Sequence, residues 1–194
     1  MRIAVAALVV AFSAAGFSQP VTAGVGLIGG ASLTQDFQNQ IFDVGFAYST
    51  PKRWITGGMV EARFPKHLAV EVDALYHELR FTDASILPNG TPNSGSPAPV
   101  VTWEFPVLVK YRLPLPKLTP LVEAGPAFRS SGNLNGTRPS NHGFTAGLGV
   151  EVRAKRVRIA PQVRYIRWAR DRRVFSAAPL TVPDQVQFLT SISF

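Results

Sequence analysis

Residues 101–112 read Val-Thr-Trp-Glu-Phe-Pro-Val-Leu-Val-Lys-Tyr-Arg, and apolar side chains occupy every second position of this stretch. One parity holds Val101, Trp103, Phe105, Val107, Val109 and Tyr111. The other parity includes the charged residues Glu104, Lys110 and Arg112. Because successive side chains of a β-strand point to opposite faces, this stretch is predicted to be a strand with one apolar and one charged face.

The same two-residue period recurs along the chain, although Leu189 and Thr190 interrupt it near the end. The 16 Gly and 16 Pro divide the sequence into short segments and argue against long helices. We therefore expect strands over residues 24–33, 54–64, 68–81, 100–112, 119–129, 142–153, 157–168 and 185–194.

The connections between the expected strands alternate between short and long. The short ones are residues 65–67, 113–118 and 154–156, and the long ones are 34–53, 82–99, 130–141 and 169–184. Short turns at one rim and long loops at the other are typical of outer-membrane barrels. The sequence therefore predicts an all-β fold of about eight antiparallel strands, closed as an up-and-down transmembrane β-barrel.

The first 23 residues have the layout of a secretory signal peptide. Arg2 is followed by an apolar run from Ile3 to Phe12 and then by small residues. Cleavage is plausible after Ala15, Ser18 or Ala23, and we favour Ala23, which makes residues 24–194 the mature barrel domain. A buried N-terminal helix is the alternative. No later stretch is long and apolar enough for a membrane-spanning helix, so a membrane role would use strands.

Alternation alone also fits a soluble barrel with its apolar face turned inward. The distribution of aromatic residues favours a membrane barrel instead. In an up-and-down arrangement the loop end carries Trp54 and Trp103, while the turn end carries Phe64, Tyr111 and Phe194. Two such bands match the two interfaces of a bilayer. Trp168 also reaches the loop end but has inward parity, and its orientation stays open.

The charged faces of the strands supply a second argument for the membrane barrel. Turned inward, they bring acidic and basic residues together in nearly equal numbers, as expected in a confined lumen. We predict an internal ion-pair network of Glu61, Glu71, Asp73, Glu104, Lys110, Glu123, Glu151, Arg153 and Arg164. Arg63, Arg112 and Arg158 have the same inward parity. The alternative is that these charges lie on the hydrated outside of a soluble barrel.

The last strand carries a resemblance to a known family. Val186, Phe188, Ile192 and Phe194 occupy alternate positions, and the segment resembles the C-terminal assembly signal of outer-membrane proteins. This resemblance implies recognition by the barrel-assembly machinery. The whole plan is similar to the small OmpA-type and OmpX-type barrels, which implies a location in the Gram-negative outer membrane.

Composition limits the chemistry that the chain can perform. The absence of cysteine excludes disulfides, thiolate nucleophiles and cysteine metal sites. The net charge of +8 resides mainly in loops and turns, where it would suit the phosphates of outer-membrane lipids and lipopolysaccharide, or would simply be solvated. Nucleic acid is not an expected partner, because the basic residues form no clustered stripe. We expect a monomer.

No constellation of residues points to catalysis or to a cofactor. Lipid A-modifying relatives of small barrels use His and Ser, but here the nearest pair, His142 and Thr145, has opposite parity. His67, His77 and His142 are too scattered to suggest zinc. The spacing of Gly24, Gly26 and Gly29 matches a dinucleotide fingerprint without the helix that it requires.

The sequence thus predicts a non-enzymatic outer-membrane protein without cofactor or metal, with a structural or surface-interaction role carried by its long loops. A narrow porin-like channel is the first alternative, and a lipid A-modifying enzyme is the second.

Overall fold

The computed structural model describes residues 21–42, 45–50, 53–86, 92–95, 98–115, 118–132, 137–173 and 180–194. The predicted signal peptide lies outside these ranges except for its last three residues, 21–23. The first strand begins at Thr22, two residues before the predicted mature start at Gly24. No helix in the described part of the chain is long and apolar enough to cross a membrane.

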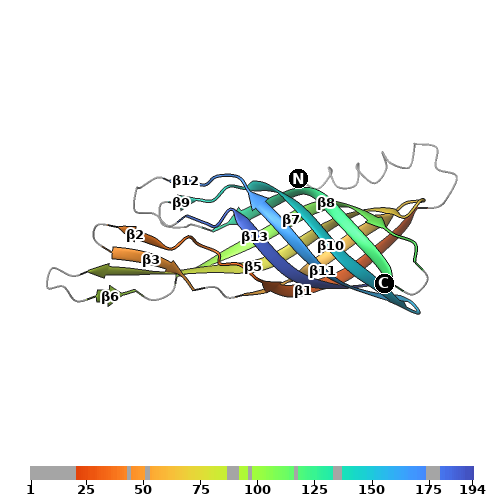
Figure 1. Ribbon diagram of the computed structural model, residues 1–194, viewed down its shortest axis with the longest axis horizontal. Helices are drawn as coiled ribbons and strands as arrows, with labels where there is room; N and C mark the ends of the chain where they lie inside the picture. The colour runs from red at the N-terminus through yellow and green to blue at the C-terminus, as the bar shows by residue number, and fades with distance from the viewer. Residues whose placement is uncertain are drawn as a thin grey trace.

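In the described part of the chain, long antiparallel strands form one closed barrel (Figure 1). They are β1 (Thr22–Ser32), β4 (Trp54–Arg63), β5 (Leu68–Ile86), β7 (Ala98–Arg112), β8 (Thr119–Ser131), β10 (His142–Ala154), β11 (Val157–Trp168) and β13 (Asp184–Ser193). Each pairs with the next one along the chain, and β1 pairs with β13 to close the cylinder. The predicted eight-stranded, up-and-down, all-β barrel is confirmed.

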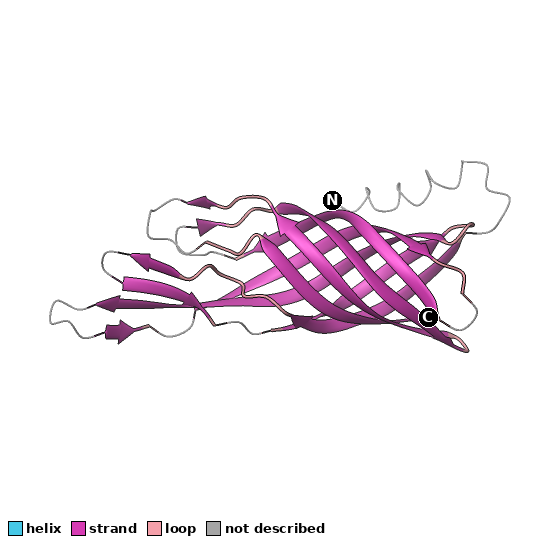
Figure 2. Ribbon diagram, viewed as in Figure 1, coloured by secondary structure: helices cyan, strands magenta, loops and turns pink. Residues whose placement is uncertain are grey.

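One end of the barrel is extended by further short strands, all of which lie at the left in Figure 1. They are β2 (Gln40–Phe42), β3 (Gly45–Ser49), β6 (Pro92–Ser94), β9 (Thr137–Arg138) and β12 (Arg172–Arg173). We call this end the loop end and the opposite end, where the short connections lie, the turn end. Figure 2 shows that strands dominate the loop-end extension as well as the barrel wall.

The long connections 34–53 and 82–99 thus contain strands of their own. Strand β5 continues to Ile86, where β3 and β6 pair with it at Gly45↔Ser85 and Ala84↔Ser94. Backbone polar groups of an extended segment need partners, and these added strands supply them.

The two-residue alternation runs through the whole wall. In β13, Gln187, Leu189 and Ser191 are buried inside the barrel, while Phe188 and Ile192 are exposed outside it. Leu189 and Thr190 thus interrupt the alternation of polar and apolar residue types, but the alternation of inward and outward side chains continues through them.

The outer surface of the barrel is predominantly apolar. Its exposed large side chains include Val25, Leu27, Val60, Val109, Val122, Phe144, Leu148, Val163, Phe188 and Ile192. A soluble barrel would turn such residues inward, so the alternative of a soluble fold with a hydrated charged exterior is excluded.

The interior holds both apolar and charged side chains. Buried apolar residues form three clusters, around Phe37, Ile55 and Trp168. Buried charged side chains lie in the middle of the barrel and toward both ends. The turn between β4 and β5 is tight because Lys66 and His67 both adopt left-handed conformations, with φ of 62° and 66°.

Candidate functional site

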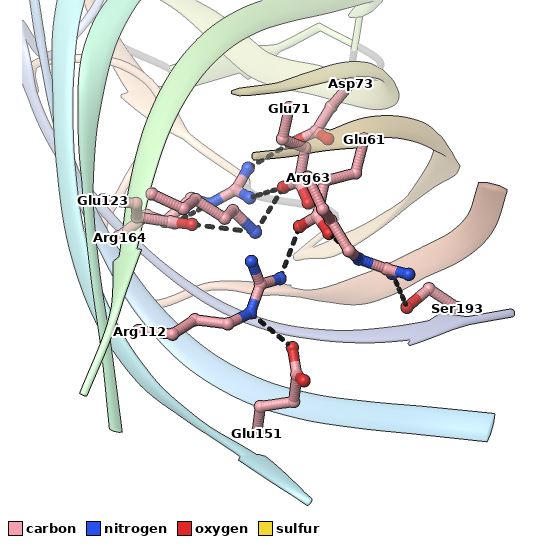
Figure 3. A network of polar contacts seen from close by, with 10 residues as sticks. Glu61, Arg63, Glu71, Asp73, Arg112, Glu123, Glu151, Arg164 and Ser193 are labelled. Carbon is pink, nitrogen blue, oxygen red and sulfur yellow. Dashed lines mark hydrogen bonds and ion pairs between the residues drawn. The ribbon is translucent and has the colours of Figure 1, made fainter. Parts of the chain in front are cut away.

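A cluster of five buried charged residues crosses the middle of the barrel (Figure 3). This central cluster consists of Glu71, Asp73, Lys110, Glu123 and Arg164. The Arg164 guanidinium donates to Asp73 Oδ2 at 2.5 Å, to Glu71 Oε1 at 3.0 Å and to Glu123 Oε1 at 2.5 Å. Lys110 Nζ lies 2.6 Å from Glu71 Oε1 and 3.1 Å from Glu123 Oε2.

The strand order explains why Arg164 closes the lumen. Three strands separate β11 from β5 in either direction around the barrel, so Arg164 reaches Glu71 and Asp73 on the opposite wall. Gly147 on β10 lies between Arg164 and Glu123 in the register. A Cβ at Gly147 would come within 2.8 Å of Glu123 Oε1, so the glycine leaves the space in which the carboxylate meets the guanidinium.

A second group, the turn-end chain, links Arg63, Glu61, Arg112, Glu151 and Arg158 in that order. Arg112 lies between the two carboxylates, 2.6 Å from Glu61 Oε2 and 2.8 Å from Glu151 Oε2. Arg63 donates to Glu61, and Arg158 Nη1 lies 3.4 Å from Glu151 Oε1. The chain of ion pairs therefore begins and ends with an arginine.

A third group, the loop-end cluster, contains Asp36, His77, Glu104 and Gln187. His77 Nε2 lies 3.5 Å from Asp36 Oδ1, and His77 Nδ1 lies 3.4 Å from Glu104 Oε1. Gln187 Nε2 donates to Glu104 Oε2 at 2.9 Å. Asp36 belongs to the segment after β1, and burial raises the pKa of its carboxyl group to about 6.

Arg129 lies near the end of β8, next to a long loop, but its side chain is buried inside the barrel. Its Cζ lies 4.4 Å from the centre of the Trp168 ring, a cation–π contact, and its Nη2 lies 3.3 Å from Asp171 Oδ1. Trp168 also points inward, and its Nε1 donates to Gln185 Oε1 at 2.8 Å. The orientation of Trp168, left open above, is therefore that of a lining residue.

Two predicted members of the network need correction. Glu104 is buried, but it contacts His77 and Gln187 in the loop-end cluster and not the central cluster. Arg153 is exposed beside the β10–β11 turn and forms no ion pair with another described residue. Its parity is inward, but it belongs to one of the last residue pairs of the β10–β11 hairpin, where the barrel opens to water.

Sequence reasoning missed Asp36, His77 and Arg129 as interior residues. His77 and Arg129 share inward parity with Asp73 and Glu123 on the same strands, and this signal could have identified them. Asp36 lies outside any strand, so no periodicity could have placed it.

The predicted aromatic residues lie at the two ends of the barrel wall. Trp54 and Trp103 are exposed at the loop end, and Tyr76 lies between them with ring centres 5.3 and 5.6 Å away. At the turn end Tyr111 is exposed and Phe64 directly follows β4. Of the C-terminal segment, Phe188, Ile192 and Phe194 are exposed on the outside, and Val186 is half-buried.

His142 and Thr145, the pair considered for catalysis, do not lie on the same face of β10. His142 is exposed on the outer face of β10, whereas Thr145 is buried and donates its hydroxyl to the Tyr165 carbonyl. Within the described ranges, no group of three or more His, Cys, Asp or Glu side chains is arranged to hold a metal ion.

A closed barrel with an apolar outside, aromatic residues at both ends and charges inside defines an integral membrane β-barrel. A model of the outer membrane protein beta-barrel domain matches residues 4–156, and the chain belongs to this family. Family membership places the protein in the bacterial outer membrane.

Two solved structures share the fold. One is Neisserial surface protein A, NspA, with a TM-score of 0.55 and 12% identity over 90% of this chain and 98% of that chain. The other is the outer membrane protein OprG from Pseudomonas aeruginosa, with a TM-score of 0.52 and 12% identity over 90% of this chain and 94% of that chain. No curated protein matches the sequence significantly. At such low identity the likeness concerns the fold alone.

Proposed function

We propose that this protein is a non-enzymatic outer-membrane barrel with a closed lumen, and that it acts through the strands and loops that it holds beyond the membrane. The observation that carries this proposal is the position of Arg164. Its side chain is 1% exposed and reaches Glu71 and Asp73 on the opposite wall at mid-barrel, while it also pairs with Glu123. An eight-stranded barrel is just wide enough for side chains to fill, so such a crossing leaves little room for bulk ion flow.

The loop-end extension supports a surface-interaction role. Strand β5 continues past the barrel as one piece, and β3 and β6 pair with its far part. A paired extension is stiffer than free loops and presents its outer loops at a defined distance from the bilayer.

The proposed partners follow from the surface chemistry. The apolar wall would contact outer-membrane lipids, and the basic residues of the rims would contact lipopolysaccharide or other phosphate-bearing headgroups. The barrel-assembly machinery would recognise the segment that ends in Ile192 and Phe194. In this proposal residues 1–23 direct export and are removed, and the barrel works as a monomer.

Planar-bilayer recording on the refolded protein tests the closed lumen. We expect no steady conductance from the unmodified protein, and openings when Arg164 is replaced by Ser. The matched control is Arg172→Ser in β12, an exposed arginine of the loop-end extension, and this variant should show no conductance. Steady conductance of the unmodified protein would refute the closed barrel.

A narrow channel is the second candidate, and one observation favours it. Asp73 Oδ1, Glu71 Oε2 and both polar atoms of the Gln162 amide are buried without a hydrogen-bond partner among the described residues. Buried polar atoms of this kind are commonly satisfied by internal water, and a continuous file of water could carry ions. If this candidate holds, Arg164→Ser should change the ion selectivity of a conductance that is already present. A lipid A-modifying enzyme is disfavoured by the separation of His142 from Thr145.

A further inference from the structure

Ser193, near the turn end, accepts a hydrogen bond from one arginine and is the register partner of a second, and the two arginines stand on strands that are not neighbours. Arg63 on β4 donates its Nη2 to Ser193 Oγ on β13 at 3.4 Å (Figure 3). Ser193 is the direct register partner of Arg158 on β11. Because β1 lies between β4 and β13, the Arg63 side chain must cross β1 to reach this position.

A glycine makes this crossing possible. A Cβ at Gly24 would lie 2.7 Å from Arg63 Nη2 and 3.0 Å from Arg63 Cζ. The guanidinium therefore lies directly over β1 at Gly24, in space that any other residue would fill. The fold creates this arrangement, because β4, β1, β13 and β11 lie in that order and Arg63 on β4 extends toward Arg158 on β11.

The surrounding charges leave these guanidiniums undercompensated. Glu61 and Glu151 are each shared with Arg112, which lies between them. Arg153 is the register partner of Arg158 on the other side, so two arginines face each other directly. The four arginines and two glutamates of this group have a summed side-chain charge of +2 (4 − 2). Like charges placed opposite each other on adjacent strands destabilise a sheet unless an anion lies between them.

We propose that the turn-end mouth of the barrel binds a phosphate group between Arg63 and Arg158, with the Ser193 hydroxyl as a further donor. Guanidinium forks match the oxygen atoms of phosphate, and two of them approaching from different strands would hold one group from two sides. The side chains of Arg63 and Arg158 are 13% and 20% exposed, so the site is reachable from water. The phosphate belongs either to a lipid headgroup of the adjacent leaflet or to a free phosphate compound.

Isothermal calorimetry with inorganic phosphate tests the site on protein refolded in an uncharged maltoside detergent at constant ionic strength. Arg158→Gln should weaken phosphate binding by about tenfold or more, because charge-assisted hydrogen bonds are lost. Gly24→Ala should weaken it as well, since the new methyl group displaces Arg63 without changing any charge. The control is Arg156→Gln in the exposed β10–β11 turn, which removes the same charge outside the proposed site.

Circular dichroism and the shift in gel migration on boiling establish that each variant is folded before titration. The proposal is overturned if the unmodified protein shows no phosphate binding. It is also overturned if Arg156→Gln weakens binding as much as Arg158→Gln, or if Gly24→Ala leaves the affinity unchanged, because the effect would then be one of general charge.

A second arm identifies the source of the phosphate. The same titration is repeated in vesicles of phosphatidylglycerol, whose headgroups surround the mouth. Loss of the calorimetric response there would assign the site to a lipid headgroup, whereas an unchanged response would assign it to a free phosphate compound.

Discussion

The Arg164 guanidinium lies 2.5 Å from the Asp73 carboxylate, although the two residues stand on strands at opposite sides of the barrel. The pair joins β11 to β5 across the lumen, where both side chains are fully enclosed. It thus ties together two walls that share no backbone hydrogen bond.

Replacing Arg164 with Gln should strongly destabilise the barrel. The change leaves Asp73, Glu71 and Glu123 with one fewer cation in a buried site, and such a loss typically costs about 3–5 kcal/mol. Urea unfolding in lipid vesicles, followed by tryptophan fluorescence, measures the free energy of unfolding. Arg172→Gln is the control, because exposed pairs contribute only about 0–1 kcal/mol. Equal urea midpoints for the two variants would contradict a buried network.

The segment that contains Asp36 should loosen as the pH rises. Its carboxyl pKa is about 6 when buried, whereas about 3.9 is usual for a free Asp. The Asp36 carboxyl group therefore binds its proton more tightly when the segment is packed in the barrel than when the segment is released into water. Packing is then strongest below about pH 4 and is lost as the pH passes through about 6.

Amide exchange reports this change, because Val182 N–H donates to the Asp36 carbonyl at 2.9 Å. After correction for intrinsic rates, protection of Val182 should fall between about pH 4 and about pH 7. The charged groups that act on Asp36 are His77, Glu104 and Arg53. Asp36→Asn cannot ionise and should remove the pH step. An increase in the protection of Val182 with pH would contradict the predicted direction of the pH effect.

Adjacent glycines of β1 should respond differently to the same substitution. A Cβ at Gly30 would lie 1.9 Å from the Phe188 carbonyl oxygen, whereas a Cβ at Gly29 would meet nothing closer than 3.7 Å. Gly30→Ala forces the backbones of β1 and β13 apart and should cost about 1–3 kcal/mol. Gly29→Ala should fold as the unmodified protein does. Thermal unfolding in detergent compares the two variants. Equal midpoint temperatures would mean that the contact between β1 and β13 accommodates the added methyl group.

Replacing Phe194 with Asp should reduce assembly into the membrane far more than Ser193→Asp. Phe194 is 62% exposed on the outer face, so a carboxylate there would face lipid. Ser193 points inward beside Arg63, which would pair with a new carboxylate. The amount of heat-modifiable protein in the outer-membrane fraction measures assembly. Similar yields for both variants would argue against a role for the terminal aromatic residue in assembly.

Local features of the sequence were sufficient to predict the wall of the barrel. Strand alternation depends only on neighbouring residues, so Trp103 could be placed outside and Glu104 inside from their positions alone. The same parity put Glu71, Lys110 and Arg164 in the lumen. It also gives His77 and Arg129 inward positions, but the depth of their burial depends on how far β5 and β8 extend past the membrane, which parity alone does not reveal.

The sequence by itself determined the class of fold and the face of each strand, because a period of two is a property of the extended chain. Only the tertiary structure decided which inward residues meet. Contacts across the lumen depend on strand order and stagger, and they join residues as distant as Asp73 and Arg164. The same dependence separated Glu104 from the central cluster, left Arg153 in water and brought Arg63 over Gly24 to Ser193.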